Sequence, residues 1–167
     1  MIFVHKFKNH KKIKNNLLSL IDEIPNEPID DGDSEKISKT DWNLPKNLKR
    51  KYLEFFYEEI EDSMSKICKI FKAKTWIIQN AWFQQYLKGD SHGWHNHSRS
   101  NISAVYYLEL PYKNLVTEFL NKTKVDIKEG DILFFPSFLM HRSPKHKGKR
   151  KTVISFNCSF SDWNGEL

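Results

Sequence analysis

Three histidines have the residue type and the spacing of a metal site. His95 and His97 are separated by one residue, so both side chains leave the same face if that segment is extended. His141 comes much later, after a hydrophobic run and Pro136, where a strand would end. An early pair alone would be a weak signal, because histidines also occur in polar surface loops. Together with the late histidine, the pair follows the pattern by which a β-sandwich closes a three-ligand site, so we predict that all three share one metal ion.

A cationic side chain follows the late histidine at the start of another strand-like run. Arg150 and Lys151 occupy this position, and either can pair with a carboxylate of a bound co-substrate. Strand alternation places Lys151 on the same face as Ser155 and places Arg150 on the opposite face. The preceding turn is rich in lysine, so an exposed charge is the alternative interpretation for both cations.

The residues after Lys74 predict the sheets that must bring these side chains together. Runs rich in aromatic and β-branched residues alternate with turns rich in Gly, Pro, Asn and Lys, which is typical of a β-sandwich or barrel. The expected strands are residues 75–87, 101–110, 114–120, 123–127, 131–137 and 151–160.

The first 74 residues predict a strand over 1–9 and two helices that cover one face of a sheet. Pro25 and Pro28 end the first helical pattern. The second helix, over 45–72, has one apolar stripe. Its members are Leu53, Phe56, Ile60, Met64, Ile67 and Phe71. Between the helices, residues 25–45 are polar and predict a long surface loop, which with the turn at 145–151 is a candidate lid.

We therefore expect one α+β domain over residues 1–167. Residues 1–74 would form the N-terminal strand, helices and loop, and residues 75–160 would form the β-sandwich core that carries the site. The length of 167 residues is enough for a domain with its own hydrophobic core.

The charge distribution leaves several classes of partner open. The formal net charge is +6, with basic residues gathered at 5–14 and 145–151 and acidic residues at 22–35. Such a balance permits a nucleic acid or an anionic ligand but does not require one. No RNP-like, helix-turn-helix or zinc-finger pattern is present, which argues against a protein that only binds nucleic acid.

The remaining features indicate a cytoplasmic protein. Cys68 and Cys158 form no CxxC motif and no disulfide framework, so we expect free buried thiols in a reducing compartment. No apolar stretch is long enough for a signal peptide or reaches the roughly 20 residues that span a bilayer, so no membrane contact is expected. His10 and His146 lie in basic segments, and we expect both to be exposed.

The chain from about Thr75 to Phe160 resembles the iron(II)- and 2-oxoglutarate-dependent oxygenases, and in particular an uncharacterised bacterial and phage branch of that superfamily. The matching stretches are AWFQQYLKGDSHGWHNHSRSNISAVYYLELP and VDIKEGDILFFPSFLMHRSPKHKGKRKTVISFN. In that branch a tryptophan segment precedes H-x-H and a small-residue strand. An FPS…H element and a hydrophobic strand ending in S-F-N follow. The resemblance covers roughly half of the chain, and its specificity lies in the order and spacing of the pieces.

This resemblance implies a double-stranded β-helix, or jelly roll, with the N-terminal helices packed on one sheet. It also implies Fe(II) as the cofactor and 2-oxoglutarate as the co-substrate. His95 and His141 fall on the two histidine ligands of the family, and His97 falls where the wider superfamily has a carboxylate. This departure leaves two alternatives: His97 is a third imidazole ligand, or Asp90 or water takes its place.

Further roles are implied around the metal. Lys151, with Arg150 as the rival, would hold the C5 carboxylate of 2-oxoglutarate, and Ser155 and Tyr107 would assist. Trp94 and His92, which adjoin the first ligand, would contact the substrate. The implied reaction is hydroxylation of an unidentified small molecule, peptide or nucleic acid, with release of succinate and carbon dioxide.

Two other functions fit the same residues. A cupin-like dioxygenase would use three histidines and no 2-oxoglutarate, and a jelly-roll binding module would keep the scaffold without catalysis. Succinate production that depends on added 2-oxoglutarate separates the first function from these two. The sequence does not predict the oligomeric state.

Overall fold

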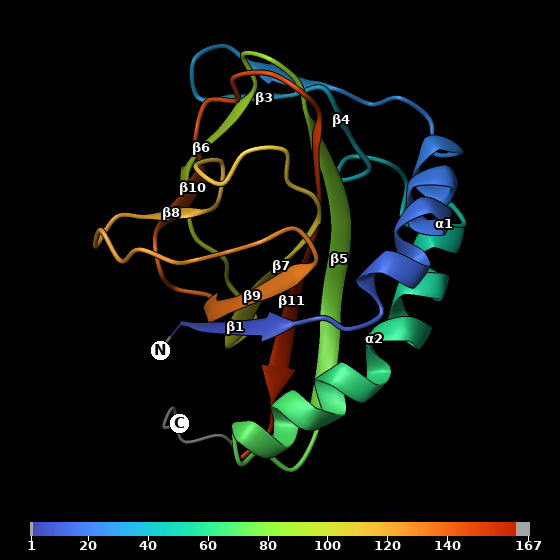
Figure 1. Cartoon of the computed structure of the whole chain (residues 1–167), viewed down its shortest axis with the longest axis vertical. Helices are drawn as coiled ribbons and strands as arrows, with labels where there is room; N and C mark the ends of the chain where they lie inside the picture. The colour runs from blue at the N-terminus through green and yellow to red at the C-terminus, as the bar shows by residue number, and fades with distance from the viewer. Residues whose placement is uncertain (1, 163–167) are drawn as a thin grey trace.

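In residues 2–162, which the computed structural model describes, two antiparallel sheets face each other and two helices cover the outer face of the larger sheet (Figure 1). This α+β arrangement agrees with the expected class. Within the same residues, no helix is both long enough and apolar enough to cross a membrane.

The larger sheet has the strand order β1-β9-β7-β11-β5-β4. Its strands are β1 (Phe3–Lys6), β4 (Lys39–Thr40), β5 (Trp76–Tyr86), β7 (Ile102–Glu109), β9 (Asp131–Pro136) and β11 (Lys151–Phe160). β11 lies between β5 and β7, and its register with β5 runs from Lys151 opposite Tyr86 to Phe160 opposite Trp76. The last strand of the chain is therefore central in the sheet, and residues far apart in sequence share its surface.

The smaller sheet has the order β2-β3-β6-β10-β8. Its strands are β2 (Ile29–Asp31), β3 (Glu35–Ile37), β6 (Ser91–His95), β8 (Glu118–Phe119) and β10 (His141–Ser143). β6 and β10 pair antiparallel with His95 opposite His141. This pairing brings the early and the late histidine onto neighbouring strands.

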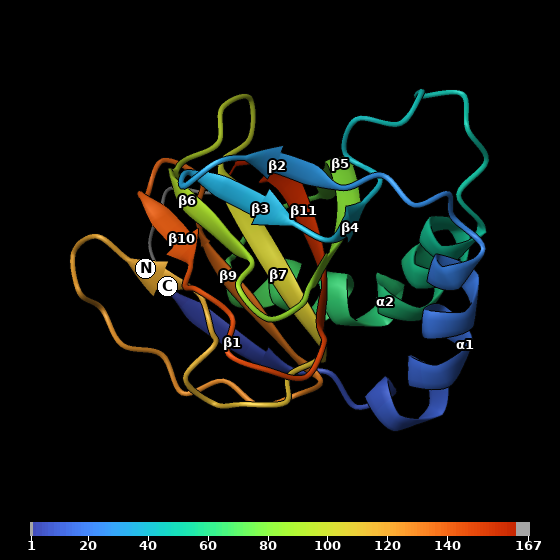
Figure 2. The same cartoon turned by 90° about the horizontal axis from the view of Figure 1, so that it is seen from above.

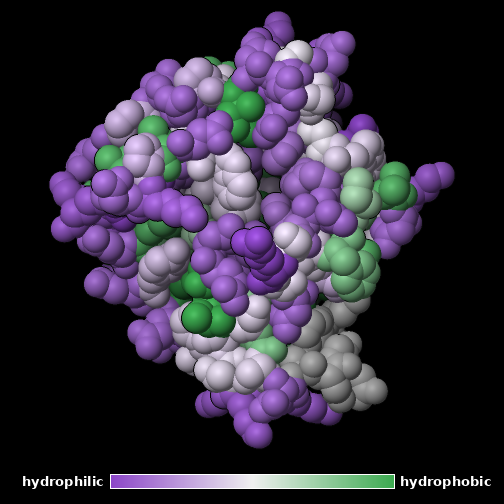
Figure 3. All heavy atoms as spheres, turned by 180° about the vertical axis from the view of Figure 1, so that it is seen from behind, coloured by the Kyte–Doolittle hydropathy of each residue, from purple (hydrophilic) through white to green (hydrophobic). Residues whose placement is uncertain are grey.

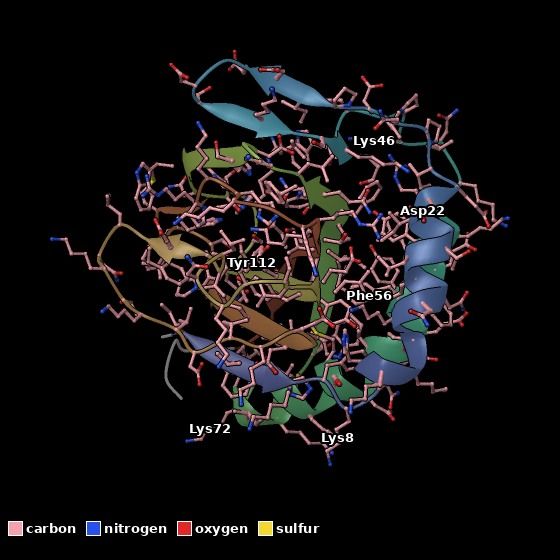
Figure 4. All side chains as sticks on the ribbon, turned by 45° about the horizontal axis from the view of Figure 1, so that its top comes forward. Lys8, Asp22, Lys46, Phe56, Lys72 and Tyr112 are labelled. Carbon is pink, nitrogen blue, oxygen red and sulfur yellow. The ribbon has the colours of Figure 1, made fainter. Side chains whose placement is uncertain are left out.

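The two helices, α1 (His10–Asp22) and α2 (Lys51–Ile70), each bury one apolar stripe, as their residue spacing predicts. Phe56 of α2 points toward the larger sheet in Figure 4 and stacks on Tyr106 of β7, with ring centroids 5.5 Å apart. A second buried apolar cluster lies between the two sheets. All of β9 is buried because each of its faces meets one of these clusters.

α2 begins at Lys51, later than the predicted start at Pro45. Arg50 has non-helical backbone angles (φ −115°, ψ 80°), and its guanidinium donates to the carbonyl oxygens of Pro45 and Leu48. It also pairs with the buried Asp41, with 2.8 Å between Nε and Oδ2. These bonds hold the preceding residues in an irregular conformation, so the helix starts only after Arg50.

Residues 25–45 are not the long surface loop that their polar composition predicts. β2 and β3 form a hairpin whose turn contains Gly32 at φ +60°, a left-handed conformation that glycine adopts without strain. β3 pairs with β6, so the hairpin extends the smaller sheet (Figure 2). β4 pairs with β5 and forms an edge of the larger sheet. Pairing with distant strands, rather than local side-chain pattern, makes these residues strands.

The predicted strands over 114–120 and 123–127 are largely wrong. Only Glu118–Phe119 pairs in the first range, and residues 123–127 have no strand. Leu115 and Ile127 are buried in the cluster between the sheets. Their burial without pairing explains why the apolar pattern resembled that of strands.

On the face seen in Figure 3, hydrophilic residues predominate and hydrophobic residues form small separate groups.

Candidate metal centre

The three predicted histidines converge at the open end of the smaller sheet. His95 ends β6, His141 begins β10, and His97 follows β6 with its backbone N–H donating to Ser137 O at 2.9 Å. The ring centroids of His95 and His141 are 4.2 Å apart, and that of His97 is 5.1 and 5.2 Å from them. One ring nitrogen from each histidine lies within 4.8 Å of the other two, so the group can hold a metal ion.

Backbone carbonyl groups orient two of these rings. His95 Nδ1 lies 2.8 Å from the carbonyl oxygen of Gly93, and His141 Nδ1 lies 2.8 Å from that of Leu139. Because a carbonyl oxygen only accepts, each ring must carry its proton on Nδ1, which leaves the lone pair on Nε2. Proteins orient metal-binding histidines in this way.

All three imidazoles are neutral at physiological pH. Burial lowers the pKa of His95. Burial and then the neighbouring His95 lower the pKa of His97 to about 4 and that of His141 to about 3. Neutral imidazole is the form that binds metal, and it suits first-row transition metals such as iron, copper or zinc. The donor set therefore fits a transition-metal ion.

A fourth histidine adjoins the group without joining it. His92 stacks on His95, with centroids 3.8 Å apart and planes at 12°. Its Nδ1 lies 3.2 Å from Gln84 Nε2, and its Nε2 lies 3.2 Å from Glu35 Oε1. Burial lowers the pKa of His92 to about 3, so the ring is neutral, accepts from the Gln84 amide and donates to the Glu35 carboxylate.

Lys151 is a buried ammonium close to the histidines. The residue is 2% exposed and lines the same cavity between the sheets as His95 and His141. Its Nζ donates to Ser143 Oγ at 2.6 Å and Leu115 O at 3.0 Å. Within the described residues no carboxylate forms an ion pair with it. Burial lowers the pKa of Lys151 to about 7, which reflects the cost of an ammonium without a counter-charge.

Arg150 lies on the opposite face of the same sheet. Its Nε and Nη2 donate to the two carboxylate oxygens of Glu109 at 2.8 and 3.1 Å. It is not among the residues that line the cavity between the sheets. The charge of Arg150 is thus already balanced, whereas that of Lys151 is not.

Ser155 and Tyr107 line the same cavity as Lys151. Tyr107 OH lies 2.8 Å from Thr117 Oγ1 and accepts from the Thr117 N–H at 3.0 Å. Burial raises the pKa of Tyr107 to about 12, so the phenol stays protonated. Ser155 Oγ donates to Gln84 Oε1 at 3.4 Å. The proton of Ser155 is thus already donated to Gln84, whereas the phenol of Tyr107 can act as donor or acceptor toward Thr117.

Trp94 and Asp90 lie away from the three histidine rings. Trp94 is 39% exposed and stacks against Arg142, whose Cζ is 4.6 Å from the ring centroid. It lines neither of the two cavities around the histidines. Asp90 is buried, and its Oδ2 accepts from Ser38 N, Ser38 Oγ and Leu87 N. Its carboxylate is occupied in holding the turn before β6.

Two histidines expected at the surface are buried. His10 is the first residue of α1, and its Nδ1 lies 2.7 Å from Tyr106 OH. His146 is held by backbone bonds to Gly89 and Asp90, and its Nε2 contacts the carbonyl oxygen of Lys149. Basic sequence neighbours suggested exposure for both, but the fold buries each side chain.

Sequence reasoning missed Tyr86, Gln84 and Ser143. Tyr86 lies opposite Lys151 and Gln84 opposite Val153, so alternation along β5 turns both inward. The Lys151 ammonium is 4.3 Å from the centroid of the Tyr86 ring. A polar Gln84 between the inward-facing Trp82 and Tyr86 was the signal that could have identified this wall of the cavity.

No protein-family model and no curated protein matches the chain. Solved structures, however, share its fold. An oxidoreductase of the 2OG-Fe(II) oxygenase family from Burkholderia pseudomallei is 15% identical, with a TM-score of 0.73 over 95% of this chain and 84% of that one. The viral collagen prolyl hydroxylase of Paramecium Bursaria Chlorella virus-1, in complex with 2OG, is 15% identical, with a TM-score of 0.67 over 94% of each chain.

HygX from Streptomyces hygroscopicus, solved with nickel and 2-oxoglutarate bound, is 8% identical, with a TM-score of 0.64 over 96% of this chain and 83% of that one. At these identities the likeness establishes a common fold.

Proposed function

We propose that this protein is an Fe(II)- and 2-oxoglutarate-dependent oxygenase that hydroxylates its substrate. In the balanced reaction, a substrate C–H, dioxygen and 2-oxoglutarate give the alcohol, succinate and carbon dioxide. The observation that carries the proposal is the buried, unpaired Lys151 in one cavity with three neutral histidines. The shared fold with 2-oxoglutarate oxygenases supports it.

The ligands of the metal would be His95, His141 and His97. When bound, Fe(II) and 2-oxoglutarate supply the oxygen-activating chemistry, in which one oxygen atom enters the substrate and the other enters succinate. The residues of this chain supply three oriented lone pairs, two of them directed by Gly93 and Leu139. Three neutral donors offset none of the charge of the ion, so the metal-binding carboxylate of 2-oxoglutarate would offset one unit of it.

Lys151 would bind the distal carboxylate of 2-oxoglutarate. Removing an ammonium from water costs several kcal/mol unless a counter-charge is provided, so a ligand carboxylate is the natural partner. Ser143 already contacts the Lys151 Nζ, and Ser155 and Tyr107 line the same space. Such a set would hold the co-substrate in one orientation and keep water from its carboxylate. Arg150, paired with Glu109, would take no part.

The finer fold assignment belongs to the same proposal. The order of the two sheets is compatible with a double-stranded β-helix, or jelly roll, formed by β5 to β11, to which residues 1–74 add β1 to β4 and the two helices. Residues 1–167 would then act as one domain. The two free buried thiols, Cys68 and Cys158, suit a reducing compartment, so we place the activity in the cytoplasm.

A three-histidine dioxygenase without 2-oxoglutarate is the second candidate. It is favoured by one observation, namely that the position of the usual carboxylate holds His97. It leaves the buried charge of Lys151 without a partner, and so does a binding module without catalysis. For this reason we rank both below the 2-oxoglutarate oxygenase.

The deciding experiment is an anaerobic titration of the Fe(II)-loaded protein with 2-oxoglutarate, followed by the visible charge-transfer absorption and by calorimetry. We expect saturable binding that Lys151→Met weakens by about 100-fold, since a buried charge pair is lost. Arg150→Met is the matched control and should change the affinity by less than about twofold. Unchanged affinity in Lys151→Met, or no succinate after dioxygen and added 2-oxoglutarate, would overturn the proposal.

A further inference from the structure

A second cavity opens beside the histidines, on the side of the β2–β3 hairpin. The residues that line it include His95, His97, Trp42, Trp82 and Glu35. The cavity has a volume of about 190 Å³. Lys151 does not line it, so a molecule bound here would reach the metal centre from a different direction than the co-substrate.

Trp42 is exposed but firmly supported. It is 50% exposed and packs edge-to-face on Trp82, with ring centroids 4.6 Å apart and planes at 67°. The preceding residue, Asp41, is buried and accepts from Arg50, Tyr52 OH at 2.7 Å and the backbone N–H of Phe83 at 3.0 Å. An exposed indole on such a rigid base presents an aromatic surface to solvent at a fixed position, as a binding residue does.

Glu35 places a carboxylate in the same cavity. One of its oxygens, Oε1, lies 3.2 Å from Nε2 of His92. Among the described residues, no lysine or arginine forms an ion pair with it. The bonds of His92 to both Glu35 and Gln84 fix the carboxylate against the wall of β5.

The hairpin that carries Glu35 is acidic in a chain that is otherwise basic. Asp30 and Asp31 lie on β2 and Asp33 lies in the turn, while Lys36 on β3 pairs with Asp30. The whole chain has a formal net charge of +6, so this negative region is a local feature. The negative charge of this hairpin would attract a cation that approaches the cavity.

We infer that the second cavity binds the cationic end of the substrate, an alkylammonium or guanidinium group on an aliphatic stem. This inference rests on the oxygenase proposed above and names its substrate class. The indole of Trp42 and the carboxylate of Glu35 would hold the cation by cation–π attraction and charge pairing. The stem would then extend toward His95 and His97, which places one of its C–H bonds next to the metal centre.

The test is calorimetric binding of small probes to the full chain, with and without Fe(II) and 2-oxoglutarate. The main probe is Nα-acetyl-L-lysine N-methylamide, and its neutral counterpart carries a second acetyl group on Nε. Nα-acetyl-L-arginine N-methylamide tests the guanidinium group. Nα-acetyl-L-proline N-methylamide tests the prolyl alternative that the similar prolyl hydroxylases raise. Free L-lysine and a lysine-containing pentapeptide distinguish an amino-acid source from a peptide source.

We expect the lysine probe to bind at least about tenfold more tightly than its Nε-acetylated counterpart. Glu35→Gln, which keeps the acceptor for His92, and Trp42→Leu should each weaken the lysine probe by about 5- to 30-fold, whereas Trp42→Phe should keep part of the affinity. Asp33→Asn removes a charge from the same hairpin outside the cavity and is the matched control, with an expected change of less than about twofold.

Equal or tighter binding of the neutral or prolyl probe overturns the inference, as does a lysine preference that survives Glu35→Gln. Failure of the proposed function has a different signature. If the lysine probe binds as expected but 2-oxoglutarate does not bind, the cation site is supported and the proposed oxygenase function is wrong. If 2-oxoglutarate binds at Lys151 and only the prolyl probe yields succinate, the oxygenase function is supported and the cation site is wrong.

Discussion

The two faces of the larger sheet differ in what they are built from. Along β11, Ile154, Phe156 and Cys158 belong to the apolar cluster under the helices. On the other face, Lys151 and Ser155 line the cavity that holds the three histidines. The face under the helices is stabilised by close apolar packing. The face toward the smaller sheet buries polar groups, which is unfavourable for stability. The helix-covered face thus serves stability, and the space between the sheets is where the proposed chemistry would take place.

The largest effect on stability should come from the helix-covered face. Phe56→Ala removes a fully buried ring that packs on Tyr106 and Phe156. We expect a loss of about 3 to 5 kcal/mol in the free energy of unfolding, measured by urea denaturation. The iron affinity of the folded protein should stay within about twofold, because the ring does not touch the cavity. If Phe56→Ala instead changed the free energy of unfolding little and lowered the iron affinity strongly, the assignment of stability to this face would be wrong.

The opposite face should respond in its metal affinity. His141→Ala removes one of the three proposed ligands, and we expect iron affinity to fall by at least about 100-fold. Iron content after anaerobic loading, measured by elemental analysis, tests this. His5→Ala, which changes a partly exposed histidine in β1, is the control and should retain its iron. Near-normal iron content in His141→Ala would contradict the assignment.

A smaller effect concerns pH. Burial lowers the pKa of Lys151 to about 7, and a bound carboxylate would raise it because it favours the charged amine. Binding of 2-oxoglutarate therefore takes up a proton above pH 7, and the affinity should fall by up to about tenfold per pH unit there while staying level below about pH 6. Calorimetry in buffers of different ionisation enthalpy measures this proton uptake.

The control for this pH effect is Lys151→Arg, whose guanidinium stays protonated throughout. If this variant binds 2-oxoglutarate, its affinity should not decline above pH 7. The same decline in both proteins would assign the titration to another group.

The parts of the fold that follow local patterns were predictable. The apolar stripe of α2 and the aromatic runs of β5 and β11 repeat with the periods of a helix and of strands, so their types followed from spacing. Strand alternation in the sequence also predicted that Lys151 and Arg150 lie on opposite faces of the sheet. For the histidines, the one-residue gap between His95 and His97 indicated a common site even though His97 lies beyond the end of β6.

What could not be predicted depends on pairing between distant segments. Glu35 and Trp42 lie in a polar stretch with the composition of a loop, and they reach the cavity only because β3 pairs with β6 and β4 with β5. His10 is buried for the same kind of reason, since Tyr106 is far away in sequence. Burial of a residue by distant partners leaves no periodic trace in the local sequence.

The unequal strand lengths of the two sheets have a consequence for assembly. β5 and β11 have 11 and 10 residues, whereas β6, β10 and β8 have 5, 3 and 2. Strands this short form few hydrogen bonds with one another, so their pairing is weakly stabilised. An ion coordinated from both β6 and β10 would act as a cross-link between them. Metal binding would thus also stabilise the smaller sheet. In the apo-protein, amide hydrogens would exchange fastest in β6, β8 and β10.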